Sequence, residues 1–322
     1  MKISPKNIIM LQQGTIMEKR RIQIDQELNA IVEYDDSFRL ILSRDNLSEY
    51  YKGFVNWHKQ PAIEISVITE GAVNVYVLER EEVVTEGNGF FIMPGFLHSI
   101  RPASGYRASK YFTLIFYPEI LYGTHGSYYE KAYYHPIANC NMPLFIFKRC
   151  DTWTERIFSG LKWIADHFSE TSPEFRLKTQ HILQDIWTLF ASNLTEAVKP
   201  GSSLHDNRKI LNMVTWLHMH YKEKFSLTLL AQSMSMSRNE CCRYFKHMMN
   251  MTITEYLLEY RLSKAAALLE SSELSITEIA GQTGFCDVSY FIKMFRQKTG
   301  VTPKAYTKKL KGQADPHDRR FL

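Results

Sequence analysis

The chain has few of the features that mark secreted, membrane-embedded or disulfide-linked proteins. It has five cysteines in 322 residues, with no CxxC pair among them and an odd total. No apolar run approaches the roughly 20 residues of a membrane-spanning helix, and the N-terminal sequence MKISPK lacks the apolar stretch of a signal peptide. The GxSxG motif of many hydrolases is also absent. We therefore expect a reduced, cytoplasmic protein that does not cross a membrane.

Basic charge is concentrated in the C-terminal third. Residues 1–204 carry a net charge of −2 and residues 205–322 carry +7. A chain of this length suggests two domains or three small ones. The basic third has the charge that a phosphate-binding module requires, although a solvated basic face of a helical domain would carry it too.

One helix-turn-helix pattern occurs twice in this basic third, first in 226–246 and again in 275–296. Each copy needs a small residue where the second helix crosses the first, a small or flexible residue in the turn, and apolar anchors in the second helix. These positions are Ala231, Ser235, Cys241 and Phe245 in the first copy and Ala280, Gly284, Phe291 and Phe295 in the second. Two such units can place two helices in successive turns of a DNA major groove. The repeat therefore predicts sequence-specific binding to double-stranded DNA.

Helix-start signals agree with this interpretation. Capping boxes are expected at Ser237…Glu240, Thr252…Glu255 and Ser275…Glu278, and Thr302-Pro303 is typical of a helix start. A single helix from Thr252 to about Glu270 would then join the two copies.

Residues 207–310 resemble the DNA-binding domain of AraC/XylS-type transcriptional regulators. The strongest match is ITEIAGQTGFCDVSYFIKMFRQKTGVTPKAY at 276–306, and Arg261-Leu262 and Ala265 also fit. The chain departs from the family at Asn250, where Gly is usual but Asn tolerates a left-handed backbone, and at Thr307, where Arg is usual.

The resemblance implies a role for the exposed residues of each second helix. Base-reading roles fall on Asn239, Cys242, Arg243, Val288, Ser289, Tyr290, Ile292 and Lys293. Asn suits adenine, Arg suits guanine, and Val or Ile can touch thymine methyl groups. Phosphate contacts are expected from Ser237, Lys246, Thr252, Arg296 and Thr302.

The N-terminal half favours strands followed by helices. Residues 63–68 and 73–78 alternate with period two, and glycines punctuate residues 31–118, which indicates a small β-barrel or sandwich. Residues 119–150 are expected to be irregular except for a strand at 144–147. Helical periodicity in 151–194 predicts a helix pair packed on the barrel, with an apolar face left over for dimerisation.

This half resembles the cupin-type sensor domain of the same family. Cupin enzymes hold a metal through an HxH pair, a Glu and a later His, whereas Asn56 stands at the first of these positions. The remaining set, His58, Glu64 and His98, could hold Zn or Fe, but we expect these residues to line a pocket for a sugar-like effector without a metal or other cofactor. Trp57 could stack on the ligand or belong to the core.

The adjacent cysteines Cys241 and Cys242 allow one further chemistry. Cys241 fits a buried anchor, and neighbouring cysteines rarely form a bridge without distorting a helix. A reactive thiol at Cys242 stays open.

Together these features predict an α+β protein of two domains: an N-terminal cupin-like β-barrel with a helix pair, and an all-α double helix-turn-helix domain. The expected parts are an N-terminal arm and barrel at 1–150, a dimerising helix pair at 151–194, a linker at 195–206, a DNA-binding domain at 207–311 and a flexible tail at 312–322. We expect an effector-responsive activator, not an enzyme, that acts as a homodimer on promoter DNA and RNA polymerase. The alternatives are a metal-dependent cupin enzyme with a helical appendage and a DNA-binding protein whose barrel only dimerises.

Overall fold

The computed structural model describes residues 24–25, 28–31, 38–50, 53–106, 109–139, 142–170, 172–194 and 203–313. The chain divides into two compact units, Met1–Arg208 and Lys209–Leu322. Residues 195–202 of the expected linker and residues 314–322 of the expected tail lie outside the described residues. No helix within the described ranges is long and apolar enough to cross a membrane.

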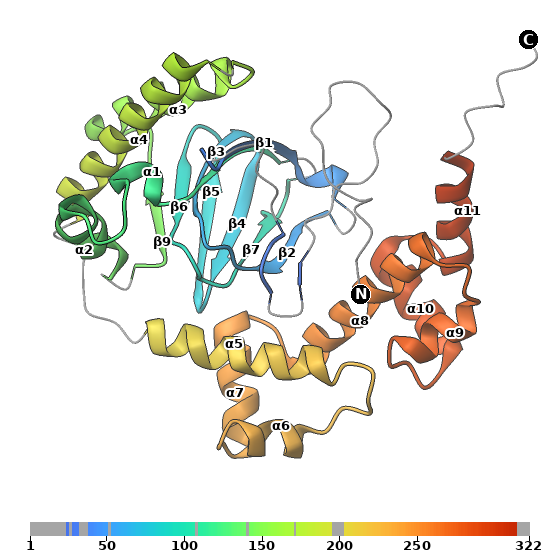
Figure 1. Ribbon diagram of the computed structural model, residues 1–322. Helices are drawn as coiled ribbons and strands as arrows, with labels where there is room; N and C mark the ends of the chain where they lie inside the picture. The colour runs from blue at the N-terminus through green and yellow to red at the C-terminus, as the bar shows by residue number, and fades with distance from the viewer. Residues whose placement is uncertain are drawn as a thin grey trace, which may run out of the picture. The chain divides into compact units, whose positions relative to one another are not determined.

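Two antiparallel sheets form the core of the first unit, as the period-two patterns predicted (Figure 1). One sheet has the order β1-β8-β3-β6-β9 and the other β2-β7-β4-β5. The strands are β1 Leu40–Asn46, β2 Val55–His58, β3 Ile63–Glu70, β4 Ala72–Val77, β5 Arg80–Thr85, β6 Gly89–Ile92, β7 His98–Pro102, β8 Lys110–Phe116 and β9 Leu144–Phe147. Large apolar side chains on these strands, such as Ile65, Phe90 and Phe116, are almost fully buried. Removing so much apolar surface from water supplies the main favourable term of folding.

The expectation that residues 119–150 are irregular outside one strand is wrong. The structure has helical turns α1 (Glu119–Tyr122) and α2 (His135–Ala138), with a π-helical turn at Glu130–Tyr134 between them. Side chains of a later helix satisfy carbonyls of this region: Gln180 donates to Ile120 O (3.0 Å), Gln184 to Leu121 O (2.9 Å) and Trp187 to Tyr133 O (2.9 Å). Tertiary packing therefore decides the conformation of a segment whose own composition favours no regular structure.

The predicted helix pair is present as α3 (Glu155–His167) and α4 (Pro173–Leu194), which lie side by side (Figure 1). The apolar positions expected to face inward at Ile157, Leu161 and Ile164 are fully buried. The ring of Phe190 packs against Phe91 with centroids 4.7 Å apart, so α4 rests on β6. The packing of the pair on the sheet is thus confirmed.

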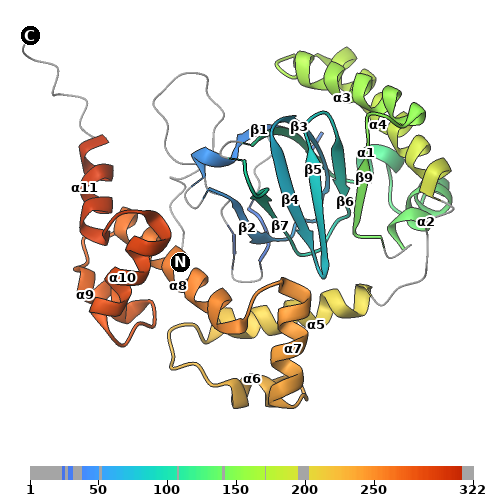
Figure 2. The same ribbon diagram turned by 180° about the vertical axis from the view of Figure 1, so that it is seen from behind.

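The second unit is all helical, as the repeat predicted (Figure 2). Its helices are α5 Ser203–Met219, which begins in the first unit, α6 Leu227–Ser233, α7 Arg238–Met249, α8 Ile253–Ser271, α9 Ile276–Gln282, α10 Val288–Thr299 and α11 Pro303–Gln313. α8 is the single joining helix expected between the two copies. Helix α5 starts at Ser203, so the last residues of the expected linker are helical.

The predicted helix starts and turns are also confirmed. Complete capping boxes occur at Thr252 and Ser275. At Ser237 the structure has only the first half of the expected box, in which the Ser237 side chain accepts from the backbone N–H of Glu240. The turn residues Ser235 (φ 54°) and Gly284 (φ 82°) both have left-handed backbones. The tight turn between the two helices requires this conformation, which glycine adopts without strain.

Gly284 has a second constraint that yields a prediction. A Cβ atom there would collide with the backbone oxygen of Tyr221 and lie 2.9 Å from Arg261 Nε, while Arg261 itself donates to Tyr221 O (2.7 Å). We expect Gly284→Ala to lower the free energy of unfolding by about 1–3 kcal/mol, because strain and collision add. Chemical denaturation followed by circular dichroism measures this loss.

Gly281→Ala is the matched control. A Cβ at Gly281 meets nothing within 4 Å, and the residue lies inside α9. Because Ala has the higher helix propensity, this change should leave stability equal or raise it by up to about 1 kcal/mol. Equal losses at both glycines would contradict the proposed collision.

Candidate functional site

Each recognition helix is held in place by a buried face. The anchors Cys241, Phe245, Phe291 and Phe295 are all 0% exposed, and the small residues Ala231 and Ala280 below the crossings are 2% and 0% exposed. Every anchor predicted from the repeat is therefore confirmed. Burial of one face fixes which residues the opposite face of α7 and α10 presents.

The exposed face of α7 carries polar and charged residues. Asn239, Cys242 and Arg243 are all exposed. Cys242 and Arg243 lie three and four residues after Asn239, so the three side chains fall within one broad stripe of the helix. An amide and a guanidinium on such a stripe can each form bidentate contacts with a base edge.

The exposed face of α10 is less polar. Ser289, Tyr290 and Lys293 are exposed, whereas Val288 and Ile292 are half-buried. Asp287 caps the start of the helix, and its carboxylate accepts a hydrogen bond from Tyr290 N at 2.6 Å. The two half-buried side chains leave part of their apolar surface open to a neighbouring group such as a thymine methyl.

The residues expected to contact phosphates fall into two classes. Lys246 and Arg296 are exposed cations in the last turns of α7 and α10. The hydroxyls of Ser237, Thr252 and Thr302 instead accept hydrogen bonds from backbone N–H groups at helix starts. Thr252 also donates to Glu255 Oε2 (2.8 Å), so its capacity for a further bond is smaller than that of the other two.

The structure explains both departures from the family pattern. Asn250 ends α7 with a left-handed backbone (φ 49°), the conformation expected for it. Thr307 bonds within α11, to Pro303 O at 3.2 Å. Its hydroxyl therefore has a local partner where the longer Arg side chain is usual.

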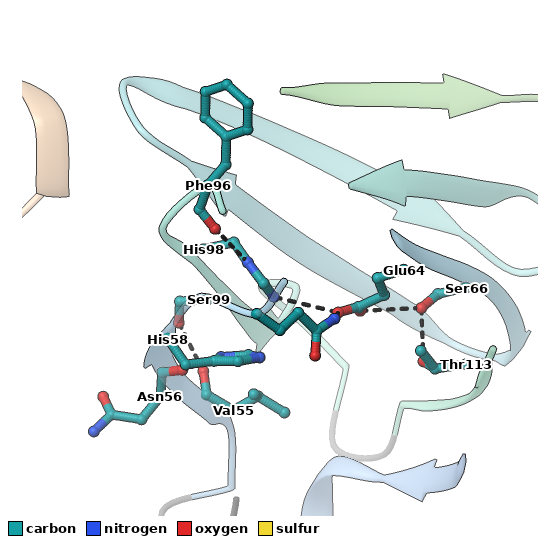
Figure 3. A network of polar contacts seen from close by, with 10 residues as sticks. Val55, Asn56, His58, Glu64, Ser66, Phe96, His98, Ser99 and Thr113 are labelled. Carbon is teal, nitrogen blue, oxygen red and sulfur yellow. Dashed lines mark hydrogen bonds and ion pairs between the residues drawn. The ribbon is translucent and has the colours of Figure 1, made fainter. Parts of the chain in front are cut away.

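A cluster of three buried residues lies inside the first unit (Figure 3). His58 ends β2, Glu64 lies on β3 and His98 begins β7. Their exposed fractions are 2%, 3% and 1%, and one nitrogen or oxygen of each lies within 4.8 Å of the others. The cluster brings together three of the four residues predicted to line the pocket. Nitrogen and carboxylate donors of this kind could hold zinc or iron.

Hydrogen bonds orient each member of the cluster. His58 Nδ1 lies 2.9 Å from Asn56 O, and His98 Nδ1 lies 2.9 Å from Phe96 O. Gln60 donates to Glu64 Oε2 at 3.0 Å. Figure 3 shows the Asn56 side chain pointing away from the cluster. The histidine rings are therefore aimed by their own backbone.

The environment favours a neutral His58 and an ionised Glu64. Burial, and next the neighbouring His98, lower the pKa of His58 to about 3. Burial raises the pKa of Glu64, but its interaction with His98, whose Nε2 lies 3.2 Å from Oε2, outweighs burial, so that the pKa of Glu64 lies below its usual value. The cluster therefore holds a negative charge in an apolar interior, where charges need close partners.

Trp57, the fourth predicted pocket residue, lies on the other side of the sheet. Its ring packs against Tyr76, with centroids 6.2 Å apart. Val77 pairs with His98 across β4 and β7, and successive residues of a strand face opposite sides, so Tyr76 faces away from the cluster. This placement does not support stacking of Trp57 on a ligand at the cluster.

Three polar residues of the cluster's surroundings were not predicted. Gln60 contacts Glu64 directly, and Ser66 Oγ lies 3.3 Å from Glu64 Oε1 and 2.6 Å from Thr113 Oγ1. Ser66 follows Glu64 by two residues on one strand, so the period of two could have identified it. Thr113 lies on β8, so its position depends on pairing between distant segments, whereas Gln60 lies in the short segment between β2 and β3, four residues before Glu64.

Two family models match the chain. Residues 48–193 match the AraC-like ligand binding domain and residues 230–309 match a helix-turn-helix domain. The chain belongs to the AraC family of transcriptional regulators. The predicted fold class is confirmed with it, since a β-rich ligand-binding domain precedes a helical DNA-binding domain in this AraC-type chain.

Several known proteins are similar to parts or most of this chain. The uncharacterized HTH-type transcriptional regulator YdeC of Bacillus subtilis (strain 168) is 28% identical over 287 residues, which cover 88% of this chain and 97% of the relative. The HTH-type transcriptional activator RhaS of Escherichia coli (strain SE11) is 32% identical over 103 residues, 32% of this chain and 37% of that one. A solved C-terminal domain of the response regulator yesN from Fusobacterium nucleatum is 34% identical, covering 30% of this chain and 94% of that chain, with a TM-score of 0.29.

The AraC-type chain is thus a transcriptional regulator that combines a ligand-binding and a DNA-binding domain. The prediction of a DNA-binding regulator is confirmed. The two family models and the relatives YdeC and RhaS are those of transcriptional regulators.

The adjacent thiols of α7 should differ in reactivity. Cys241 is buried and Cys242 exposed, and burial raises the pKa of the Cys241 thiol to about 11. Because the thiolate is the nucleophile, we expect iodoacetamide at pH 8 to alkylate Cys242 in the folded protein and to spare Cys241. Tandem mass spectrometry of the peptide that contains both residues gives the two rates. In denaturant both should react, and equal rates in the folded protein would rule out the anchoring role of Cys241.

Proposed function

We propose that this regulator reads a specific DNA site with α7 and α10 and changes transcription when a small molecule binds its β-rich unit. The observation that carries the proposal is the contrast between the two sides of these helices. Their anchors are fully buried, whereas Asn239, Arg243 and Lys293 on the other side are exposed. A helix with this division can enter a major groove without disturbing its own domain.

The two helices would read DNA in different ways. On α7, Asn239 and Arg243 would make hydrogen-bonded contacts with bases, with Cys242 beside them. On α10, Val288 and Ile292 would touch thymine methyl groups, and Ser289, Tyr290 and Lys293 would supply the polar contacts. Lys246 and Arg296, with Ser237, Thr252 and Thr302, would contact phosphates and fix the register.

The effector would be a small polar molecule, with a sugar as the leading class. The polar side chains around the buried cluster support this, because hydroxyl-rich ligands need converging donors and acceptors. The effector would favour one arrangement of the chain's parts over another and so change transcription. By analogy with RhaS, the regulator would act as an activator through RNA polymerase in the cytoplasm, without catalytic activity of its own.

We further propose that the chain forms a homodimer through α3 and α4. A groove of about 370 Å³ runs between these helices and is lined by Glu155, Arg156, Ser159, Gly160, Lys178, His181, Ile182 and Asp185. Leu177 on α4 is 56% exposed. An exposed apolar side chain beside a groove of mixed charge suits contact with a second copy of the same surface.

Arg243→Ala tests base reading. We expect the variant to lose preference at one base position by about 1–3 kcal/mol, because a bidentate contact to guanine is removed. Lys246→Ala should weaken binding to all sequences alike, since phosphates carry no sequence information. Selection from a random DNA library at fixed salt, followed by sequencing, separates the two effects.

Lys162→Ala is the control, because this exposed lysine lies on α3 and pairs with Asp166. It should leave both affinity and preference unchanged. An Arg243→Ala protein that keeps the full base preference would remove Arg243 from the reading residues.

Leu177→Glu tests the dimer. Two added charges facing each other across a symmetric contact repel and are costly to desolvate, so we expect the dimer dissociation constant to rise at least tenfold. Sedimentation velocity over a range of protein concentrations measures it. Leu229→Glu, a comparable change at a 54% exposed residue of α6, should leave association unchanged. Equal association of the wild-type and Leu177→Glu proteins would contradict a dimer through this face.

A further inference from the structure

Hydrogen bonds within the protein do not satisfy every buried polar atom in the cluster of His58, Glu64 and His98. A backbone carbonyl only accepts hydrogen bonds. Because each Nδ1 lies 2.9 Å from a carbonyl oxygen, each ring must carry its proton on Nδ1. In the neutral imidazole the Nε2 atom then has a free lone pair.

The lone pair of His98 has no hydrogen-bonding partner. Its Nε2 atom lies 3.2 Å from Glu64 Oε2, but among the described residues it makes no hydrogen bond. A carboxylate oxygen is also an acceptor, and Figure 3 joins the two atoms by a dashed line. With a neutral His98 two lone pairs would face each other, so the arrangement is favourable only when a positive charge, either a second proton on His98 or a metal ion, stands between the two atoms.

We propose that this positive charge is a divalent transition-metal ion, held by His58 Nε2, Glu64 and His98 Nε2 in the ligand-binding unit. The proposal rests on the sensory role given to this unit above and specifies what the unit holds. Three strands supply the three ligands: β2 and β7 pair directly at His58 and His98, and β3 brings Glu64 from the other sheet.

The donor set selects the class of ion. Two imidazole nitrogens and one carboxylate suit Zn²⁺, Fe²⁺ or Co²⁺, whereas Mg²⁺ and Ca²⁺ prefer oxygen ligands. Gln60 donates to Glu64 Oε2 (3.0 Å) and Ser66 lies 3.3 Å from Oε1. Such outer contacts orient a ligating carboxylate, as they do in characterised metal sites.

Three protein ligands leave coordination positions open. Asn56, two residues before His58, points its side chain away, so it does not fill a fourth position. An oxygen atom of a polar effector could then bind the ion directly. The bound ion would thereby allow the buried cluster to recognise a hydroxyl- or carboxylate-bearing molecule.

The first experiment uses the full-length protein, free of any affinity tag and stripped with a chelator. Co²⁺ is titrated in while its visible absorption is recorded, and Zn²⁺ content is measured by mass spectrometry after gel filtration. We expect one equivalent of metal per chain and an intensified Co²⁺ spectrum, because a low-symmetry nitrogen and oxygen site differs from hydrated Co²⁺. Absence of stoichiometric binding by the folded wild-type protein would overturn the proposal.

Variants locate the ion. Glu64→Gln and His98→Gln should each weaken Co²⁺ binding at least tenfold, since even outer-sphere changes cost this much. The control is His125→Gln, which alters a 74% exposed histidine beside Glu119 and Glu130, the kind of surface group that binds stray metal. Unchanged binding in the first two variants, or equal loss in the control, would show an adventitious ion only.

Two further measurements keep the outcome clear. If a cluster variant fails to fold by circular dichroism, the melting temperature of the wild-type protein decides: equimolar Zn²⁺ should raise it relative to chelator, and no shift would count against the site. Specific DNA binding is measured on the same samples. Metal-free protein that still selects its DNA site but never binds metal would refute this inference alone, whereas loss of all sequence preference in every sample would refute the proposed function.

Discussion

Burial of the Glu64 carboxylate is the constraint on which the centre of the first unit depends. An isolated charge inside a protein is too costly to persist, so the fold must bring partners to it. It does so with His98 from β7, Gln60 from the segment before β3, and Ser66 from the same strand. Of these partners only His98 comes from the other sheet, so the packing of the two sheets on each other sets both the core and the chemistry that the sensor can offer.

The second unit depends on a constraint of a different kind, close crossing of helices. A small residue at Ala231 and at Ala280 lets the second helix of each copy approach, and a left-handed turn at Ser235 and at Gly284 sets its direction. Arg261 of the joining helix α8 donates a hydrogen bond to Tyr221 O. This bond links the helix that precedes the second copy to the loop that precedes the first copy. The exposed faces of α7 and α10 are a consequence of this packing.

The local periodicities of the sequence were sufficient for most of the fold. Capping residues marked the starts of α7, α8 and α9, and alternation marked β3 and β4, because these signals arise from backbone geometry within a few residues. They failed at 119–150, where Tyr, His and Pro favour no regular structure and α4 imposes helical turns through Gln180, Gln184 and Trp187. Local rules do not include such contacts.

The sequence by itself determined the repeated helix-turn-helix and its buried anchors, since both follow from residue types at fixed local spacing, and its resemblance to AraC/XylS-type regulators implied the cupin-like barrel and the regulatory role. Only the tertiary structure decided that His58, Glu64 and His98 meet within 4.8 Å, that two carbonyls set the protons of the histidines, and that Trp57 lies on the opposite side of its sheet. The approach of Glu64 to the two histidines depends on the packing of one sheet on the other. The approach of His58 to His98 depends on the pairing of β2 with β7, where a shift of one residue would turn every side chain to the other face.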